Sequence, residues 1–344
     1  MSGLVAGVDS HQEVLVCAVV DGMGRLVEAG SFDNSPDGLE AACGWIKALG
    51  VGTVGIEGSG SYGRGLAQTL IAADITVLDV PPQMCARGRR RQKTLSKTDQ
   101  GDALLIARLI LSQDLAQVAA LGSSDELRAL CTYRRELVEQ LKQTGGRIHG
   151  ELTKTYPGYR QQIKGRVTRP STIKQIRRLT ADDNSIRTEL VKARLTDMEQ
   201  LNQKIRELET RIQQAYDETG STLTEIDGIA TVGAAEILGY VTQPKTYPTK
   251  SKFAMANGTA PLPASSGKTI RHRLNQGGNR DLNRIIHIAA VTQIRYPRTE
   301  GHTYYQNKLN QGKTKKEALR CLKRKISDRI WTHLQHPPKP TNLT

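Results

Sequence analysis

Four acidic residues are the side chains of this sequence best suited to chemistry. Asp9 follows the apolar run Leu4–Val8, Glu57 ends a second apolar run, and Asp99 and Asp102 stand three residues apart. Hard divalent cations prefer carboxylate oxygens, and two bound cations cut phosphodiesters by stabilising the attacking and leaving oxygens. Each residue alone is more often a loop residue or a helix cap. Their order along the expected elements is what favours a metal-dependent nuclease centre.

The elements expected around these residues follow an order that brings them together. Apolar alternation and turn residues predict strands over 4–8, 14–20, 26–32, 53–57 and 75–80, and helices over 36–49 and 63–73. The first three strands are antiparallel, and helices and strands then alternate. This order is typical of a ribonuclease H-like α/β fold, in which the first and fourth strands are parallel neighbours. Asp9 and Glu57 are therefore expected to converge beside a helix that carries Asp99 and Asp102.

The distribution of charge points to a polyanionic partner. The 344 residues carry a formal net charge of +15, yet residues 1–80 contain only three Lys/Arg against ten Asp/Glu. The positive excess therefore lies entirely beyond residue 80. An acidic catalytic sheet followed by a basic remainder suits a nuclease that binds cations in one place and phosphates in another.

The cysteines and the hydropathy favour a cytoplasmic protein. The five cysteines are scattered, with no C-x-x-C spacing, which indicates reduced thiols and no zinc site. No signal peptide and no apolar run of membrane-spanning length is visible, so we expect a soluble, nucleoid-associated protein of a prokaryotic cytoplasm.

Beyond residue 120 the pattern becomes helical. Apolar residues recur every three or four positions over 124–218, which predicts a helical hairpin or a coiled coil, within one chain or between two. Residues 223–238 resemble a helix-hairpin-helix, whose backbone N–H groups can grip a phosphate. We therefore expect a mostly α-helical second half, divided into a coiled-coil connector over 121–219, a C-terminal domain over 220–335 and a flexible tail over 336–344, after an α/β domain over 1–120.

Two adjacent serines stand on a Pro/Gly-rich segment near the C-terminal end. Ser265 and Ser266 are followed by several basic residues. A serine hydroxyl is a poor nucleophile unless a base, a metal or nearby positive charge activates it. On residue types alone, a turn or cap role is the commoner one for such a serine.

The chain resembles the insertion-sequence transposases known as bridge-RNA-guided recombinases, which join a RuvC-like DEDD domain to a C-terminal serine domain. The resemblance covers nearly the whole chain, in two independent sets of motifs in the right order. The matching residues are Gly7-Val8-Asp9-Ser10-His11, Ile56-Glu57-Gly58-Ser59-Gly60-Ser61-Tyr62-Gly63, Lys97-Thr98-Asp99 with Asp102-Ala103, Gly258 with Ala260-Pro261 and Ser266-Gly267, Gly278-Asn279-Arg280 with Leu282, and Gly312–Arg320.

The resemblance implies roles for these residues. The four carboxylates would bind Mg²⁺, with Mn²⁺ able to substitute, and Ser266 would be the nucleophile that forms a covalent phosphoserine link to DNA. Ser265 stays a rival for that role. Because the carboxylates and the serine lie on separate domains, the resemblance also implies a site shared between protomers. Gln276 departs from the family pattern, where a basic residue is common.

The same resemblance implies the partners. They are donor and target double-stranded DNA, a noncoding guide RNA encoded by the element, and further copies of this chain, as a dimer that forms a tetramer on DNA. Sequence selection would lie mainly in base pairing. The basic residues that we expect to contact nucleic acid are Arg87, Arg89, Arg90, Arg91, Lys93, Lys268, Arg271, Arg273, Arg280, Lys315, Lys316 and Lys323, the last three on a helix expected over 313–331.

Two other functions remain open on the sequence. A hydrolytic RuvC-like nuclease or Holliday-junction resolvase would use the same carboxylates with water and form no covalent intermediate. A non-enzymatic nucleic-acid-binding protein would depend only on the basic helices and the helix-hairpin-helix-like element. A sugar-kinase-like ATPase shares the strand-terminal Asp and the Gly-rich turns, but that signal is weak.

Overall fold

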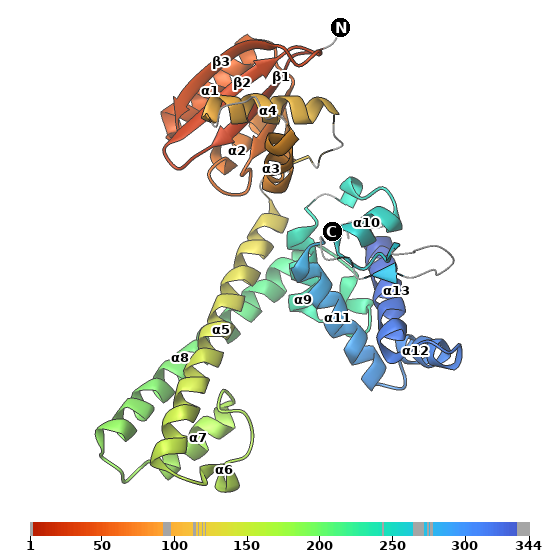
Figure 1. The fold of residues 1–344 in the computed structure, drawn as a ribbon. Helices are drawn as coiled ribbons and strands as arrows, with labels where there is room; N and C mark the ends of the chain where they lie inside the picture. The colour runs from red at the N-terminus through yellow and green to blue at the C-terminus, as the bar shows by residue number, and fades with distance from the viewer. Residues whose placement is uncertain are drawn as a thin grey trace, which may run out of the picture. The chain divides into compact units, whose positions relative to one another are not determined.

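The chain forms two compact units, Met1–Leu121 and Gly122–Thr344, in a computed structural model (Figure 1). The structure describes residues 3–91, 98–112, 115, 117, 118, 120, 122–242, 244–263, 272, 273, 275 and 278–335. The expected flexible tail, 336–344, lies outside these residues. Each unit is described by itself below.

The N-terminal unit is built on a five-stranded mixed sheet. Its strands are β1 (Val5–Ser10), β2 (Val14–Val20), β3 (Leu26–Asp33), β4 (Thr53–Glu57) and β5 (Thr76–Val80). The order in the sheet is β3-β2-β1-β4-β5. β1, β2 and β3 are antiparallel, whereas β4 runs parallel to β1 and β5 parallel to β4. This is the expected ribonuclease H-like topology, and each strand begins and ends within two residues of its predicted position.

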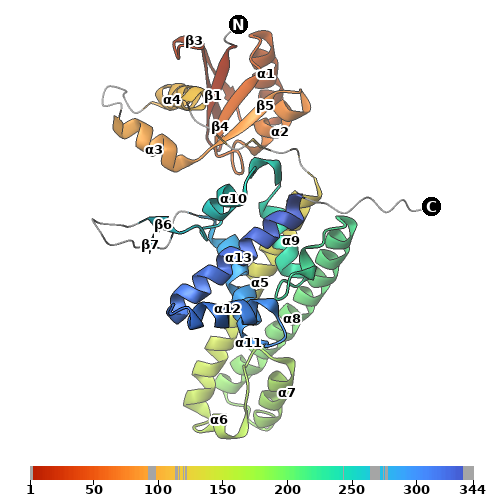
Figure 2. The same cartoon turned by 90° about the vertical axis from the view of Figure 1, so that its right-hand side faces the viewer.

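Helices cover both faces of this sheet. α1 (Pro36–Ala48) and α2 (Arg64–Ala72) lie on one face and α4 (Asp99–Ser112) on the other (Figure 2). Side chains alternate between the faces of a strand, so Ala6 and Val8 belong to the core under α1 and α2, whereas Gly7 meets α4. Asp9, two residues after Gly7, therefore points to the face that α4 covers.

One prediction in this unit is wrong. The Pro81-Pro82 pair follows the strand expected over 75–80, and the dense basic run over 87–93 predicts a loop beyond it. Instead, Pro82 begins helix α3 (Pro82–Arg91), so residues 87–91 are helical. Proline is favoured in the first turn of a helix, because its missing N–H would have no intrahelical partner there. The same residue that stops one element can therefore start the next.

The C-terminal unit begins with a long antiparallel pair of helices, α5 (Ser123–Thr155) and α8 (Ile186–Glu218). Arg134 Nε donates to Glu209 Oε1 at 2.9 Å, and Arg187 Nη1 donates to Glu151 Oε2 at 3.0 Å, as only an antiparallel register allows. α6 (Tyr159–Gln162) and α7 (Pro170–Leu179) connect the two helices. The apolar repeat over 124–218 is thus buried within one chain.

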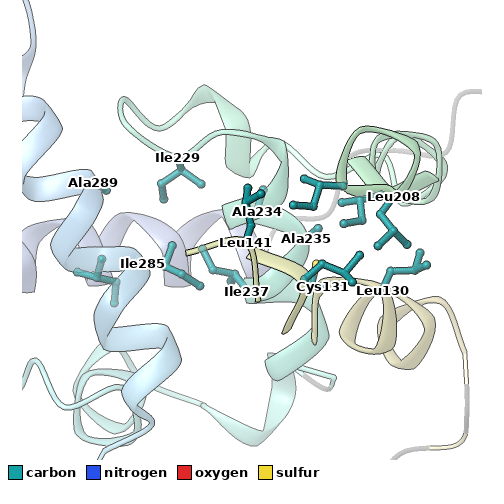
Figure 3. Packing of buried hydrophobic residues seen from close by; sticks show 14 of the residues in the cluster. Leu130, Cys131, Leu141, Leu208, Ile229, Ala234, Ala235, Ile237, Ile285 and Ala289 are labelled. Atoms are coloured by element: carbon teal, nitrogen blue, oxygen red, sulfur yellow. The ribbon is translucent and has the colours of Figure 1, made fainter. Parts of the chain in front are cut away.

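The described residues of this unit form five further α-helices: α9 (Thr231–Tyr240), α10 (Lys250–Ala256), α11 (Arg280–Arg295), α12 (Glu300–Asn310) and α13 (Lys315–Gln335). α9 packs between the helical pair and α11 (Figure 3). The segments expected over 121–219 and 220–335 consequently share one hydrophobic core. Where the first helix of a helix-hairpin-helix was expected, the chain makes only the 3-10 turn Leu223–Glu225.

The ends of the helices confirm one further pattern. The motif Thr314-x-x-Glu317 predicts a capping box, and Thr314 N donates to Glu317 Oε2 at 2.9 Å while Glu317 N donates to Thr314 Oγ1 at 3.3 Å at the start of α13. Among the described residues, no helix is both long and apolar enough to cross a membrane.

The contact between β1 and α4 generates a stability prediction. A Cβ at Gly7 would lie 2.2 Å from the backbone N of Ala107, so Gly7→Ala must push the helix off the sheet. We expect it to lower the free energy of unfolding by about 2 kcal/mol or more. Urea unfolding followed by Trp45 fluorescence, in a Trp331→Phe background, reports on this unit alone, because the chain has two tryptophans.

Gly44→Ala is the matched control. Gly44 lies exposed in α1 with nothing within 4 Å of an added Cβ. Alanine there is expected to stabilise the unit by up to about 1 kcal/mol, because glycine is a poor helix former. Equal effects of the two substitutions would contradict the close packing of β1 against α4.

Candidate active site

Asp9 and Glu57 are direct neighbours in the sheet. The parallel register of β1 and β4 pairs Asp9 with Glu57, near the carboxyl ends of both strands. Asp9 is buried, with 8% of its surface exposed, and Glu57 is half-buried. The convergence expected from the strand order is therefore present.

α4 brings the other two carboxylates to the same place. Its backbone contacts β1 at Gly7, and the side chains of Ile106 and Ile110 pack directly against Gly55 of β4. Asp99 and Asp102 occupy the first turn of this helix. The positive end of the helix dipole favours acidic side chains at that position.

The charged groups around Asp9 affect the pKa of its carboxyl. Burial raises the pKa of the Asp9 carboxyl above its ordinary value, because the charged form loses water. His11 lowers this pKa, whereas the other three carboxylates raise it further: Glu57, Asp102 and Asp99. The site thus concentrates negative charge that a cation would neutralise.

The loops around the site are held by side-chain hydrogen bonds. Ser10 Oγ donates to the Glu57 carbonyl oxygen at 2.6 Å, which ties the ends of β1 and β4 together. Asn34 Nδ2 donates to the carbonyl oxygens of His11 at 2.9 Å and Tyr62 at 3.0 Å. Ser59 Oγ donates to Asp79 Oδ1 of β5. These bonds fix the segments that follow β1 and β4.

His11 is the side chain that the sequence analysis missed. Its Nε2 lies 3.3 Å from Asp9 Oδ2 and 3.6 Å from Asp99 Oδ1. Asp9, His11 and Asp99 form a group whose ligand atoms all lie within 4.8 Å of one another. The signal was present, because a residue two positions beyond a strand-terminal Asp returns to the same face.

Many of the expected nucleic-acid contacts lie where side chains are not described. Arg87, Arg89, Arg90 and Arg91 lie on α3 and Arg273 on strand β7 (His272–Arg273), but only their backbone is described. The two serines and several basic residues lie outside the described residues altogether: Ser265, Ser266, Lys93, Lys268 and Arg271.

The residues that flank segment 259–277, called the serine-bearing segment below, are nevertheless fixed. A Cβ at Gly278 would lie 2.2 Å from the backbone N of Gly258, so the chain closes on itself at these two glycines. Asn257 is fully buried: its Nδ2 donates to Ser327 Oγ at 2.8 Å, and its Oδ1 accepts from Thr259 N at 3.1 Å. The residues on either side of segment 259–277 are therefore held at one point of the fold.

The basic side chains of α11 and α13 differ in exposure. Arg280 begins α11 and is exposed, as are Lys315 and Lys316 at the start of α13. Lys323 was expected to be exposed but is half-buried, and its Nζ donates to Asn283 Oδ1 at 2.6 Å. Burial lowers the pKa of Lys323, and the charge of Arg280 lowers it further.

Two family models match the chain in the order of its two units. A DEDD transposase domain of the IS110 type matches residues 6–157, and a domain described as "Transposase IS116/IS110/IS902 family" matches residues 220–306. Together they span more than two-thirds of the chain. It belongs to the IS110 family of transposases.

Curated relatives agree with this family. The transposase is 24% identical over 287 residues to an uncharacterized 43.6 kDa protein of insertion element IS110 from Streptomyces coelicolor, across 67% of this chain and 69% of that protein. It is 26% identical over 138 residues to an uncharacterized 44.8 kDa protein of insertion element IS116 from Streptomyces clavuligerus, across 39% of this chain and 34% of that one.

Among solved structures, the transposase is similar to RuvC from Thermus thermophilus. RuvC in complex with a Holliday junction substrate matches at 13% identity and a TM-score of 0.29, across 34% of this chain and 99% of RuvC. Another RuvC structure matches at 15% identity and a TM-score of 0.28.

The donor set of the transposase suits a divalent cation. Carboxylates from two adjacent strands and one helix converge, and oxygen-rich sets of this kind bind hard divalent ions. A transposase with such a ribonuclease H-like site is a DNA-cutting enzyme. Asp9, Glu57, Asp99 and Asp102 would hold the cation.

The crowding of carboxylates predicts that the site destabilises the unit without a cation. We expect Asp9→Asn to raise the unfolding temperature by a few degrees in EDTA at neutral pH, because it removes a buried charge among like charges. Mg²⁺ should stabilise the wild type more than Asp9→Asn, because binding favours the folded state. Trp45 fluorescence in the Trp331→Phe background measures both effects.

Glu13→Gln is the control for this experiment. Glu13 is exposed in the turn between β1 and β2, and removal of its charge should leave the unfolding temperature in EDTA unchanged. A lower unfolding temperature for Asp9→Asn than for the wild type in EDTA would contradict the electrostatic account.

The anchor of the serine-bearing segment can be tested separately. Asn257→Ala leaves the buried Ser327 hydroxyl and the Thr259 hydroxyl without their partner, so we expect the free energy of unfolding to fall by about 3 kcal/mol. Trp331 fluorescence in a Trp45→Phe background follows this unit. Asn310→Ala, at the exposed end of α12, should change stability by less than about 0.5 kcal/mol. Similar losses in the two variants would rule out the buried network.

Proposed function

We propose that this IS110-family transposase cuts and rejoins DNA strands through a serine nucleophile, Ser266, assisted by a carboxylate-bound Mg²⁺ site. The observation that carries the proposal is the pairing of Asp9 with Glu57 beneath the first turn of α4. Ser266 comes from the resemblance of the Ser266-Gly267 pair to the serine domains of the family, with Ser265 as its rival.

In this proposal the carboxylates and the serine act on the same phosphodiester: the carboxylates hold the cation, and the serine is the nucleophile. The cation, when bound, supplies positive charge beside the phosphate oxygens. Ser266 Oγ forms a bond to phosphorus and gives up its proton, while the bond from phosphorus to the departing strand oxygen breaks and that oxygen gains a proton. A hydroxyl of another DNA strand then attacks the phosphoserine, which rejoins DNA and restores Ser266. The serine link conserves the energy of the broken bond.

The surroundings of the serine-bearing segment support anion binding there. Arg280 is exposed at the N-terminus of α11, where the helix dipole also favours an anion. Asn279 caps this helix by accepting from the backbone N–H groups of Asp281 and Leu282 at 2.9 and 3.0 Å. A phosphate held here would lie close to the anchored ends of the segment.

We further propose that a noncoding guide RNA selects donor and target DNA by base pairing. The support is the basic excess beyond residue 80 and the low aromatic content of 4%, which favour contacts to the backbone of nucleic acid over base stacking. We also propose that further copies of the chain assemble on DNA, so that the carboxylates of one copy work with the serine of another.

A covalent trapping assay tests the chemistry. Transposase, RNA transcribed from the flanking DNA, labelled donor and target DNA, and Mg²⁺ are combined and resolved on a denaturing gel. We expect a protein–DNA adduct that disappears in Ser266→Ala, because its nucleophile is gone, and that persists in Ser265→Ala. Asp9→Asn should reduce adduct formation by at least about a hundredfold, the size expected when a major electrostatic contribution is removed.

The other outcomes identify the alternatives. Cleavage without an adduct, unaffected by either serine substitution, would establish a hydrolytic nuclease or junction resolvase. That alternative has one observation in its favour, since all four carboxylates lie within the N-terminal unit. DNA binding without cleavage, unchanged in Asp9→Asn, would leave a nucleic-acid-binding protein. Omission of the RNA tests the guide: equal adduct yield without it would overturn RNA guidance.

A further inference from the structure

The His11 imidazole lies between two of the carboxylates, where the carboxylate site gives it no role. Its Nε2 is 3.3 Å from Asp9 Oδ2 and 3.6 Å from Asp99 Oδ1, so one nitrogen faces two oxygens from different elements. Within the described part of the chain, this is the group of His, Cys, Asp and Glu side chains whose ligand atoms gather closely enough to share a metal ion.

The backbone of His11 is fixed on both sides. Its N–H donates to the Val14 carbonyl oxygen at 2.9 Å, and its carbonyl oxygen accepts from Asn34 Nδ2 at 2.9 Å. Asn34 also binds the Tyr62 carbonyl oxygen in the segment that follows β4. The imidazole is therefore presented from a rigid turn, while 46% of its side chain is open to a ligand.

A simple ion pair accounts poorly for this arrangement. Both separations exceed the normal N–H···O range of about 2.7–3.2 Å, and Nε2 carries at most one hydrogen to share between two carboxylates. Around an octahedral ion with ligands at about 2.1 Å, neighbouring ligand atoms lie roughly 3 Å apart. Three ligand atoms from three residues within 4.8 Å need only a small inward movement to reach that spacing.

The geometry points to His11 Nε2 as a metal ligand beside Asp9 and Asp99, in a site that binds Mn²⁺ more tightly than Mg²⁺. Mg²⁺ is a hard ion that prefers oxygen, whereas imidazole favours first-row transition ions. One nitrogen among several carboxylate oxygens therefore shifts the selectivity of the site toward the transition-metal ion. Mg²⁺ still binds, but more weakly. This inference rests on the carboxylate metal site of the proposed function and adds a nitrogen ligand to it.

Direct metal binding tests the inference without reference to DNA cleavage. The full chain is titrated with Mn²⁺ and followed by electron paramagnetic resonance, and bound Mn²⁺ is examined by spin-echo modulation, which detects a directly bound nitrogen. We expect the nitrogen modulation in the wild type and its loss in His11→Gln. The Mn²⁺ Kd should rise at least about tenfold, because a ligand is worth no less than the outer-shell partners of metal sites.

Selectivity provides a second readout. Glutamine offers an oxygen in place of the nitrogen, so the Mg²⁺ Kd of His11→Gln, measured by competition with Mn²⁺, should change less than the Mn²⁺ Kd. The preference for Mn²⁺ over Mg²⁺ should therefore shrink. His287→Gln, which removes an exposed histidine from α11, is the matched control and should leave the modulation and both Kd values unchanged.

The variants separate failure of this inference from failure of the metal site. If Asp9→Asn weakens Mn²⁺ binding while His11→Gln alters neither the modulation nor the Kd, His11 is no ligand and the carboxylate site stands. If Asp9→Asn leaves Mn²⁺ binding unchanged, the metal site of the proposed function itself is wrong. Trp45 fluorescence of each variant in the Trp331→Phe background, at the start of the titration, confirms that the N-terminal unit is folded.

Discussion

The candidate active site depends on one packing constraint, the direct contact between the backbones of β1 and α4. Gly7 leaves no room for a side chain, since even a Cβ would lie 2.2 Å from Ala107 N and 2.3 Å from the Ala103 carbonyl oxygen. The helix therefore lies flat on the strand, and its first turn comes over the carboxyl end of the sheet. A larger residue at position 7 would lift Asp99 and Asp102 away from Asp9 and Glu57.

This constraint brings with it an electrostatic cost. The contact that positions α4 also brings four carboxylates to one end of the sheet. Burial makes the charged form of Asp9 unfavourable there. The fold offsets part of that cost with the N-terminus of α4, whose dipole favours Asp99 and Asp102. It also places His11 beside Asp9, and the His11 side chain lowers the pKa of the Asp9 carboxyl. The site is thus arranged for a cation at the expense of the stability of the empty unit.

The sequence predicts the sheet well because each of its signals is local. Alternating apolar residues set the strands, and a parallel β1–β4 pair follows from strand order, so the neighbours Asp9 and Glu57 could be named in advance. The failures have equally local causes. Proline at position 82 starts a helix as readily as it ends a strand, and an apolar repeat cannot say what else packs on it, so the shared core of α5, α8 and α9 was not foreseen.

Side-chain environment was the part of the site least accessible to sequence. Lys323 belongs to a basic stripe on α13, and a stripe predicts exposure. In the structure Lys323 is instead half-buried, and its ammonium group donates to Asn283 Oδ1. Asn283 in turn donates to the Asn257 carbonyl oxygen at the anchor of the serine-bearing segment. His11 shows the opposite error. Its distance from Asp9 along the chain was visible, but its approach to Asp99 depends on where α4 lies, and only the Gly7 contact determines that.

The distribution of charge along the chain suits a cation site. A cation site needs accumulated negative charge, whereas a phosphate site needs positive charge, and the two requirements oppose each other where they meet. β1 and β4, the strands that carry Asp9 and Glu57, contain no Lys or Arg. The basic residues 87–91 lie on α3 of the same unit, and Arg280, Lys315 and Lys316 lie in the C-terminal unit. The positive charge of the chain therefore lies on elements other than these two strands, which agrees with the acidic segment 1–80 and the basic remainder.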